Sequence, residues 1–93
     1  MPSAQGTITF VNASAFGASV YALDENGNEN FVVDLSPSQS SKQDTVAGQV
    51  WVVKDKDTGQ QVGTAMGKAG DQTYEIKFRR SRGGPEPAGS GGG

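Results

Sequence analysis

The sequence contains no cysteine and no histidine. Without cysteine, disulfide bonds, zinc–thiolate sites and thiol nucleophiles are excluded. Without histidine, the chain lacks the commonest general base near neutral pH and the commonest metal ligand, so Ser-His-Asp and Cys-His catalytic arrangements are excluded. Most of the Asp and Glu side chains fall in segments expected to be solvated turns. We therefore expect no enzymatic activity, no cofactor and no metal site.

Long apolar runs are also missing. No stretch approaches the roughly 18 apolar residues of a membrane span, and the N-terminus has no apolar run of signal-peptide length. We therefore expect a soluble chain without a targeting segment that does not enter a membrane. A cysteine-free chain is compatible with a reducing compartment, which favours the cytoplasm.

Basic side chains are scarce in residues 1–78, which carry nine acidic and five basic groups. An acidic body argues against nucleic acid as a partner, because binding phosphates needs a clustered basic surface. Residues 79–93 contain three arginines but no Val, Ile, Leu, Phe, Tyr or Trp, and therefore cannot bury enough apolar surface to order the chain. The sequence predicts one domain over residues 1–78, followed by a disordered tail or linker over residues 79–93.

Short alternating or apolar runs recur along the domain, separated by turn residues, and no segment has sustained helical periodicity. The runs predict strands at residues 7–11, 19–23, 31–35, 40–45, 49–53, 61–66 and 72–78. The polar run 40–45 is typical of an edge strand. Seven short strands of this kind indicate an all-β protein, a seven-stranded antiparallel β-sandwich. Its core is thin, with nine valines, two isoleucines, two leucines and four phenylalanines, so we expect modest stability.

Two short motifs each have a simpler explanation than a binding or modification site. The segment 24–29 has the oxygen-rich look of a calcium loop, but its glycine stands fourth rather than sixth, and Asn26-Gly27 is the strongest short signal for a hairpin turn. Asn12-Ala13-Ser14 matches the N-glycosylation acceptor pattern, which is short enough to occur often by chance. We therefore expect a hairpin turn at the first motif and assign no site to either.

The orientation of Trp51 determines whether the sheet carries an aromatic binding anchor. It lies between Val50 and Val52, and alternation places those two valines on the opposite face of the strand. If the valines face the core, the indole points outward and offers a binding anchor. If Trp51 and Val53 face the core instead, no such anchor exists. The pattern leaves both orientations open.

Several segments together resemble the β-domain of the von Hippel-Lindau tumour suppressor family. The resemblance covers about 50 of the 93 residues, and its most specific parts are the Gly48-x-x-Trp51 unit and the Asn-Gly hairpin. The matching segments are residues 10–12, 20–21, 24–27, 35–37, 45–51 and 55–59. The resemblance implies a seven-stranded sandwich. The family's helical domain, which recruits elongin and a ubiquitin-ligase scaffold, would have to follow Phe78, so we expect an isolated β-domain without a ligase role.

The resemblance also implies a peptide-binding face. In that family, aromatic rings pack on a hydroxyproline ring, while a serine and a histidine bond its hydroxyl group. By position, Trp51 matches one tryptophan of that site and Tyr21 falls where another stands. Thr45 falls on the serine, Gln49 on the histidine and Val32 on a tyrosine.

We therefore expect a monomeric, non-catalytic binding module for an extended peptide that contains proline or hydroxyproline. Its face would comprise Tyr21, Val32, Thr45, Gln49 and Trp51. Aromatic grooves accept preformed extended chains at low entropic cost. The alternative is a structural or assembly sandwich, or a stable scaffold, that has no pocket. A concentration-dependent dimer in light scattering would favour that alternative.

Overall fold

The structure is a computed structural model that describes residues 4–79, and within that range it has seven β-strands and no helix. The strands are β1 (Gln5–Asn12), β2 (Ala18–Leu23), β3 (Glu29–Leu35), β4 (Ser40–Val46), β5 (Val50–Asp55), β6 (Gln61–Met66) and β7 (Gly70–Ile76). They form two sheets, which confirms the expected fold class. The tail expected for residues 79–93 lies outside the described residues, apart from Arg79.

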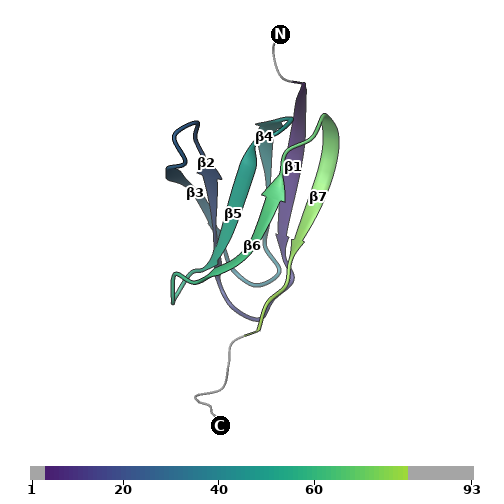
Figure 1. The fold of residues 1–93 in the computed structure, drawn as a ribbon. Helices are drawn as coiled ribbons and strands as arrows, with labels where there is room; N and C mark the ends of the chain where they lie inside the picture. Colours follow the sequence, from purple (N-terminus) through teal and green to yellow (C-terminus); the bar gives the residue numbers. More distant parts are fainter. Residues whose placement is uncertain (1–3, 80–93) are drawn as a thin grey trace.

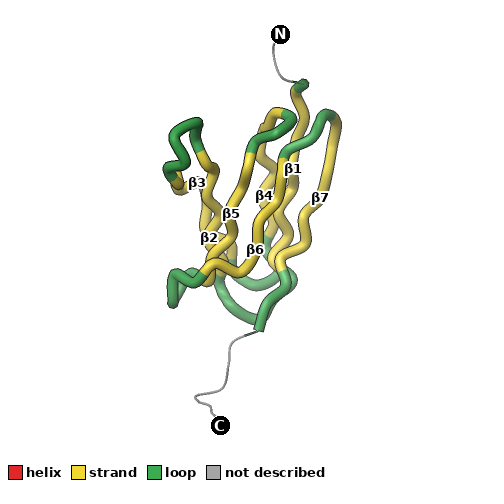
Figure 2. The backbone as a smooth tube through the Cα atoms, viewed as in Figure 1, coloured by secondary structure: helices red, strands yellow, loops and turns green. Residues whose placement is uncertain are grey.

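One sheet has the strand order β4-β1-β7 and the other has the order β3-β2-β5-β6 (Figures 1 and 2). The polar strand β4 lies at an edge, as the sequence indicated. All strand pairs are antiparallel except β1 and β7, which run parallel. This departs from the purely antiparallel sandwich expected from the sequence. The five strands β2 to β6 lie between β1 and β7 in the chain, so no hairpin turn imposes an antiparallel direction on this pair.

The core lies between the two sheets and is centred on Phe10 of β1. Ile8 and Phe10 are fully buried on one face of the strand, as their alternation predicted. The Phe10 ring lies 5.3 Å from the Trp51 ring and 5.9 Å from the Tyr74 ring, measured between centroids. The other core residues are Ala18, Val20, Leu35, Val53 and Ile76. Because the core is this small, each of its large side chains is expected to carry a sizeable share of the stability.

The β2–β3 hairpin turns where the Asn-Gly pair predicted. Gly27 has a φ of 83°, a conformation that glycine adopts without steric cost. The Asp24 carboxylate accepts hydrogen bonds from the backbone N–H groups of Asn28 and Asn26, both at 2.9 Å. These bonds, that from Asn28 above all, lower the pKa of Asp24. The Asp24 carboxylate thus stabilises the turn. Residues 4–79 contain no group of three or more Asp or Glu side chains able to bind a metal ion.

Asn12 is a fully buried polar residue that joins three segments of the chain. Its Nδ2 donates to the carbonyl oxygens of Phe16 at 2.8 Å and of Leu35 at 3.0 Å. Its Oδ1 accepts from the backbone N–H of Ser14 at 3.0 Å and from the Ser14 hydroxyl at 2.6 Å. All its side-chain hydrogen-bonding groups are therefore used inside the protein. The match of residues 12–14 to the N-glycosylation pattern is explained by this internal network, because a buried side-chain amide is inaccessible to glycosylation.

Candidate functional site

Trp51 faces the core, which settles the orientation that the sequence left open. Its side chain is only 4% exposed and packs in the cluster centred on Phe10. An indole standing clear of the sheet, as the aromatic binding face requires, is therefore not present. The pattern was ambiguous because apolar residues occupy both faces of the inner strand β5: Val52, on the outer face, is also 4% exposed. Alternation of apolar and polar residues distinguishes the inner from the outer face of a strand only where polar residues occupy the outer, solvent-exposed face.

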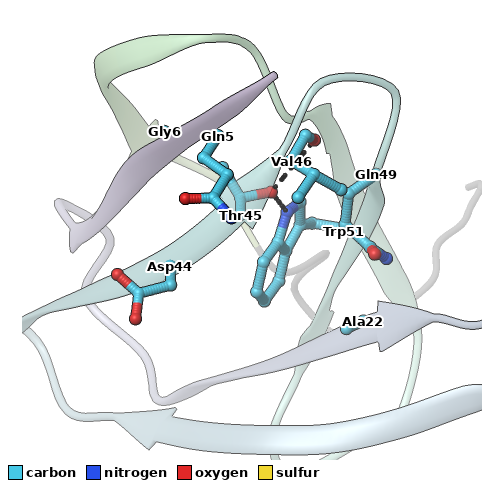
Figure 3. A pocket seen from close by; sticks show the side chains of 8 residues that line it. All are labelled: Gln5, Gly6, Ala22, Asp44, Thr45, Val46, Gln49 and Trp51. Carbon is cyan, nitrogen blue, oxygen red and sulfur yellow. Dashed lines mark hydrogen bonds between the residues drawn. The ribbon is translucent and has the colours of Figure 1, made fainter. Parts of the chain in front are cut away.

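The edge of the Trp51 ring nevertheless lines a pocket of about 510 Å³ that opens at one end of the sandwich (Figure 3). Three of the five predicted site residues, Thr45, Gln49 and Trp51, meet there. The other lining residues are Gln5, Gly6, Ala22, Asp44 and Val46. The pocket thus lies where β4 of one sheet faces β2 and β5 of the other. Ligand pockets typically measure about 300–1,000 Å³.

The polar side chains at the pocket floor are held by internal hydrogen bonds. The indole Nε1–H of Trp51 donates to the Thr45 hydroxyl oxygen at 3.0 Å, as Figure 3 shows. The Thr45 hydroxyl lies 3.4 Å from the Val46 carbonyl oxygen, to which it donates a long bond. The Gln49 Nε2 donates to the carbonyl oxygens of Leu23 at 2.5 Å and of Val50 at 3.1 Å. The floor is therefore preorganised, and its hydrogen-bond donors are already used.

Ala22 is one of the lining residues that sequence reasoning missed, since Tyr21 was expected in its place. Neighbouring residues of a strand point to opposite faces, so a shift of one position exchanges the two sides of the sheet. The structure places Ala22 against the core and the pocket, and the pairing of β2 with β3 shifts register between Val20 and Tyr21. The small side chain of Ala22 leaves open the space that a larger residue would occupy. The inward alternation of Ala18, Val20 and Ala22 was the available signal.

Tyr21 lies on the outer face of the four-stranded sheet, away from the pocket. Its ring packs edge-on against Phe31 with centroids 5.8 Å apart, and the Lys54 ammonium lies 4.9 Å from the Tyr21 ring centre. Lys54 also forms an ion pair with Glu29, and the hydrogen bond that Lys54 donates to the Glu29 carboxylate raises the pKa of Lys54. Tyr21 therefore belongs to a separate surface group and does not join Trp51 in an aromatic cage.

Val32 also lies outside the pocket. It is half-buried on β3 and packs against the edge of the core. β3 is separated from β5 by β2 in the sheet, so a side chain on β3 is one strand further from Trp51 than Ala22 is. The five residues implied by the resemblance thus divide into three that line one pocket and two that do not.

The outer edge of β4 passes the mouth of the pocket and pairs with no strand among residues 4–79. The Ala47 N–H bonds the Ala4 carbonyl oxygen at one end of the β1–β4 pair, and the Asn12 N–H bonds the Gln39 carbonyl oxygen at the other. Hydrogen-bonded pairs alternate in an antiparallel ladder, so the β4 residues at positions 41, 43 and 45 bond β1. The backbone groups of Lys42 and Asp44 consequently point out of the free edge.

Comparison with known proteins does not place the chain in a family. No protein-family model matches the sequence. A search of curated proteins likewise finds no match. The fold and the pocket therefore define the class: a small two-sheet β-sandwich with an end pocket beside a free strand edge. Residues 4–79 include no helix of the length and apolarity needed to span a bilayer.

Proposed function

We propose that this domain is a non-catalytic, monomeric binding module that receives an extended peptide along the free edge of β4. The observation that carries the proposal is the position of the pocket, which opens directly beside that edge. A free edge supplies backbone hydrogen bonds to an added strand, and an adjacent pocket selects one of its side chains. The two features together form a peptide-recognition site.

The first part of the site consists of the backbone N–H and C=O groups of Lys42 and Asp44, which point out of the free edge of β4. A peptide residue aligned with this edge exchanges backbone N–H and C=O hydrogen bonds with β4. The backbone N–H and C=O groups of the residues before and after it point away from β4. Proline at those flanking positions removes only N–H groups that would not bond β4. Proline also holds its neighbours extended, which lowers the entropic cost of binding. An extended proline-containing peptide is thus suited to the edge.

The side-chain part of the site is the pocket between the sheets. Side chains of an added strand alternate across the sheet, so every second one points toward the gap between β4 and the other sheet. There it meets Ala22, Val46 and the edge of Trp51. The likeness to the von Hippel-Lindau β-domain supports a peptide ligand through Thr45, Gln49 and Trp51. The positions of Tyr21 and Val32 leave hydroxyproline without the ring cage implied for that family, so proline and hydroxyproline peptides are both candidate ligands.

A binding role suits this pocket better than catalysis does. Its lining contains a single ionisable side chain, Asp44. General acid–base chemistry by paired carboxylates needs a second group within reach of the same substrate atom. The Thr45 hydroxyl already accepts from Trp51, and the Asp44 side chain next to it in the chain lies on the opposite face of β4. We therefore propose that the pocket binds a ligand and catalyses no reaction.

Filling the pocket tests the proposal. In Ala22→Leu the longer side chain occupies the space beside Trp51, and we expect it to weaken binding of capped Pro-norleucine-Pro and Hyp-norleucine-Hyp peptides about ten-fold. Trp51 is the only tryptophan, so its fluorescence reports binding directly, with calorimetry as a second readout. Ala15→Leu adds the same atoms to an exposed loop at the other end of β1 and should change affinity less than two-fold. Equal affinity for both variants, or no binding at millimolar peptide, would leave the structural or assembly role as the better explanation.

A further inference from the structure

The side chains of Lys42 and Asp44 lie on the outer face of the three-stranded sheet. In the register of β4 with β1, Asp44 lies opposite Thr7, whereas Thr45 lies opposite Gly6 on the inner face. Lys42 and Asp44 are both exposed, and Figure 3 shows the Asp44 carboxylate turned away from Trp51. The free edge of β4 therefore presents a charged side chain beside each of its two outward-facing backbone groups.

The two charges differ in sign and have no internal partner. The row of residues that crosses the sheet at Asp44 continues through Thr7 to Asp71, and the Thr7 hydroxyl donates to the Asp71 carboxylate at 2.6 Å. The row that crosses at Lys42 contains no acidic residue. Among residues 4–79, neither Lys42 nor Asp44 takes part in an ion pair. The outer face along this edge thus has one acidic and one basic position, two residues apart.

A peptide that adds to this edge in the antiparallel direction brings its side chains into register with those of β4. Directly opposed residues of an antiparallel pair carry their side chains on the same face of the sheet. The peptide residues opposite Thr45 and Gln43 therefore point toward the inner face, and these are the positions where proline loses no hydrogen bond to β4. The residues opposite Asp44 and Lys42 bond the edge through their backbone and point to the outer face.

We propose that the site selects a peptide in which proline, a basic residue, proline and an acidic residue follow one another from the N-terminus. The basic residue lies opposite Asp44 and the acidic residue opposite Lys42. Opposite charges at directly opposed positions attract and like charges repel, so the edge reads the order of the two charges. This inference rests on the proposed function and adds a direction and a charge order to its ligand.

The expected preference is moderate because both protein side chains are exposed. Each exposed cross-strand pair changes an equilibrium by about 1.5- to three-fold. Exchanging the two charges of the peptide turns two attractive pairs into two repulsive ones. The exchange should therefore change the affinity about five-fold, while the backbone hydrogen bonds and the inward-facing prolines stay the same.

Two capped peptides of identical composition, Pro-Lys-Pro-Glu and Pro-Glu-Pro-Lys, test this inference on the full chain. Both have zero net charge, so a general attraction to the acidic domain does not separate them. We expect Pro-Lys-Pro-Glu to bind about five-fold tighter by Trp51 fluorescence and calorimetry, and added salt to reduce the difference. Equal affinities, or the reverse preference that a parallel peptide would give, overturn this inference and leave the proposed function standing. If neither peptide binds at millimolar concentration, both fail.

Exchanging the two protein charges should reverse the preference. The double variant Lys42→Asp with Asp44→Lys keeps the net charge and alters only exposed positions, and we expect it to bind Pro-Glu-Pro-Lys more tightly. The control Glu75→Lys with Lys77→Glu exchanges an exposed ion pair at the other edge of the same sheet and should keep the preference of the parent chain. A Lys42 and Asp44 exchange that keeps the parent preference, or a control that reverses it, contradicts the inference. The comparison of the two peptides on the parent chain does not depend on either variant.

Discussion

Replacing Asn12 by aspartate is expected to lower the free energy of unfolding by about 3–5 kcal/mol. The change keeps the size of the side chain and the oxygen that accepts from Ser14, but it replaces the Nδ2 donor by an oxygen that faces the carbonyl oxygens of Phe16 and Leu35. Both carbonyls lose a donor, and a charge is introduced at a fully buried position. Urea denaturation followed by Trp51 fluorescence measures the loss.

The pH dependence distinguishes this cause from general damage to the fold. Burial raises the pKa of the introduced carboxyl group above its value in the unfolded chain. The part of the penalty that comes from the charge is therefore absent below the unfolded pKa of about 4, where both states are protonated, and grows as the pH rises. The exposed residue Asn30 offers a control, since Asn30→Asp should cost less than about 0.5 kcal/mol. A deficit of similar size at both positions would contradict the role assigned to Asn12.

Replacing Trp51 by alanine is expected to cost about 3–5 kcal/mol, because it removes the largest side chain of a small core and one hydrogen-bond partner of the Thr45 hydroxyl. The whole stability of a small domain is of the order of 5–15 kcal/mol, so the variant should be close to unfolding at 37 °C. Circular dichroism during urea denaturation measures the change without relying on the lost fluorophore.

Tyr21→Ala supplies the comparison for Trp51. Tyr21 packs on Phe31 and beneath Lys54 on the outer face, contacts expected to contribute about 1 kcal/mol. The structure therefore predicts a large difference between two aromatic residues that the resemblance placed in one site. Similar losses for the two variants, or a Trp51 variant as stable as the parent, would contradict the buried position of the indole.

The local features of this fold were readable from the sequence because local chemistry determines them. Alternation placed Ile8 and Phe10 in the core, and Asn26-Gly27 marked the hairpin turn. The parallel pairing of β1 with β7 joins residues that are 64 positions apart in the chain, with no turn between them to indicate direction. Strand positions therefore follow from pattern, while the pairing of distant strands depends on the packing of the whole domain.

The candidate site was harder to predict because a shift of one position along a strand changes which side chain faces the pocket. The β2–β3 pairing shifts register between Val20 and Tyr21, and it is Ala22 rather than Tyr21 that meets Trp51. Such features arise where the two sheets meet, and no run within one strand encodes them.

The measurement that tests the account most directly is a map of amide and indole N–H chemical shifts on titration with a capped Pro-norleucine-Pro peptide. We expect the largest changes at the Trp51 indole N–H and at the backbone of Asp44 and Gln49, with little change at Tyr21 and Phe31. Changes centred on Tyr21 and Phe31 would place the ligand on the outer face of the four-stranded sheet. That result, or the absence of any change at millimolar peptide, would contradict the pocket beside β4 as the binding site.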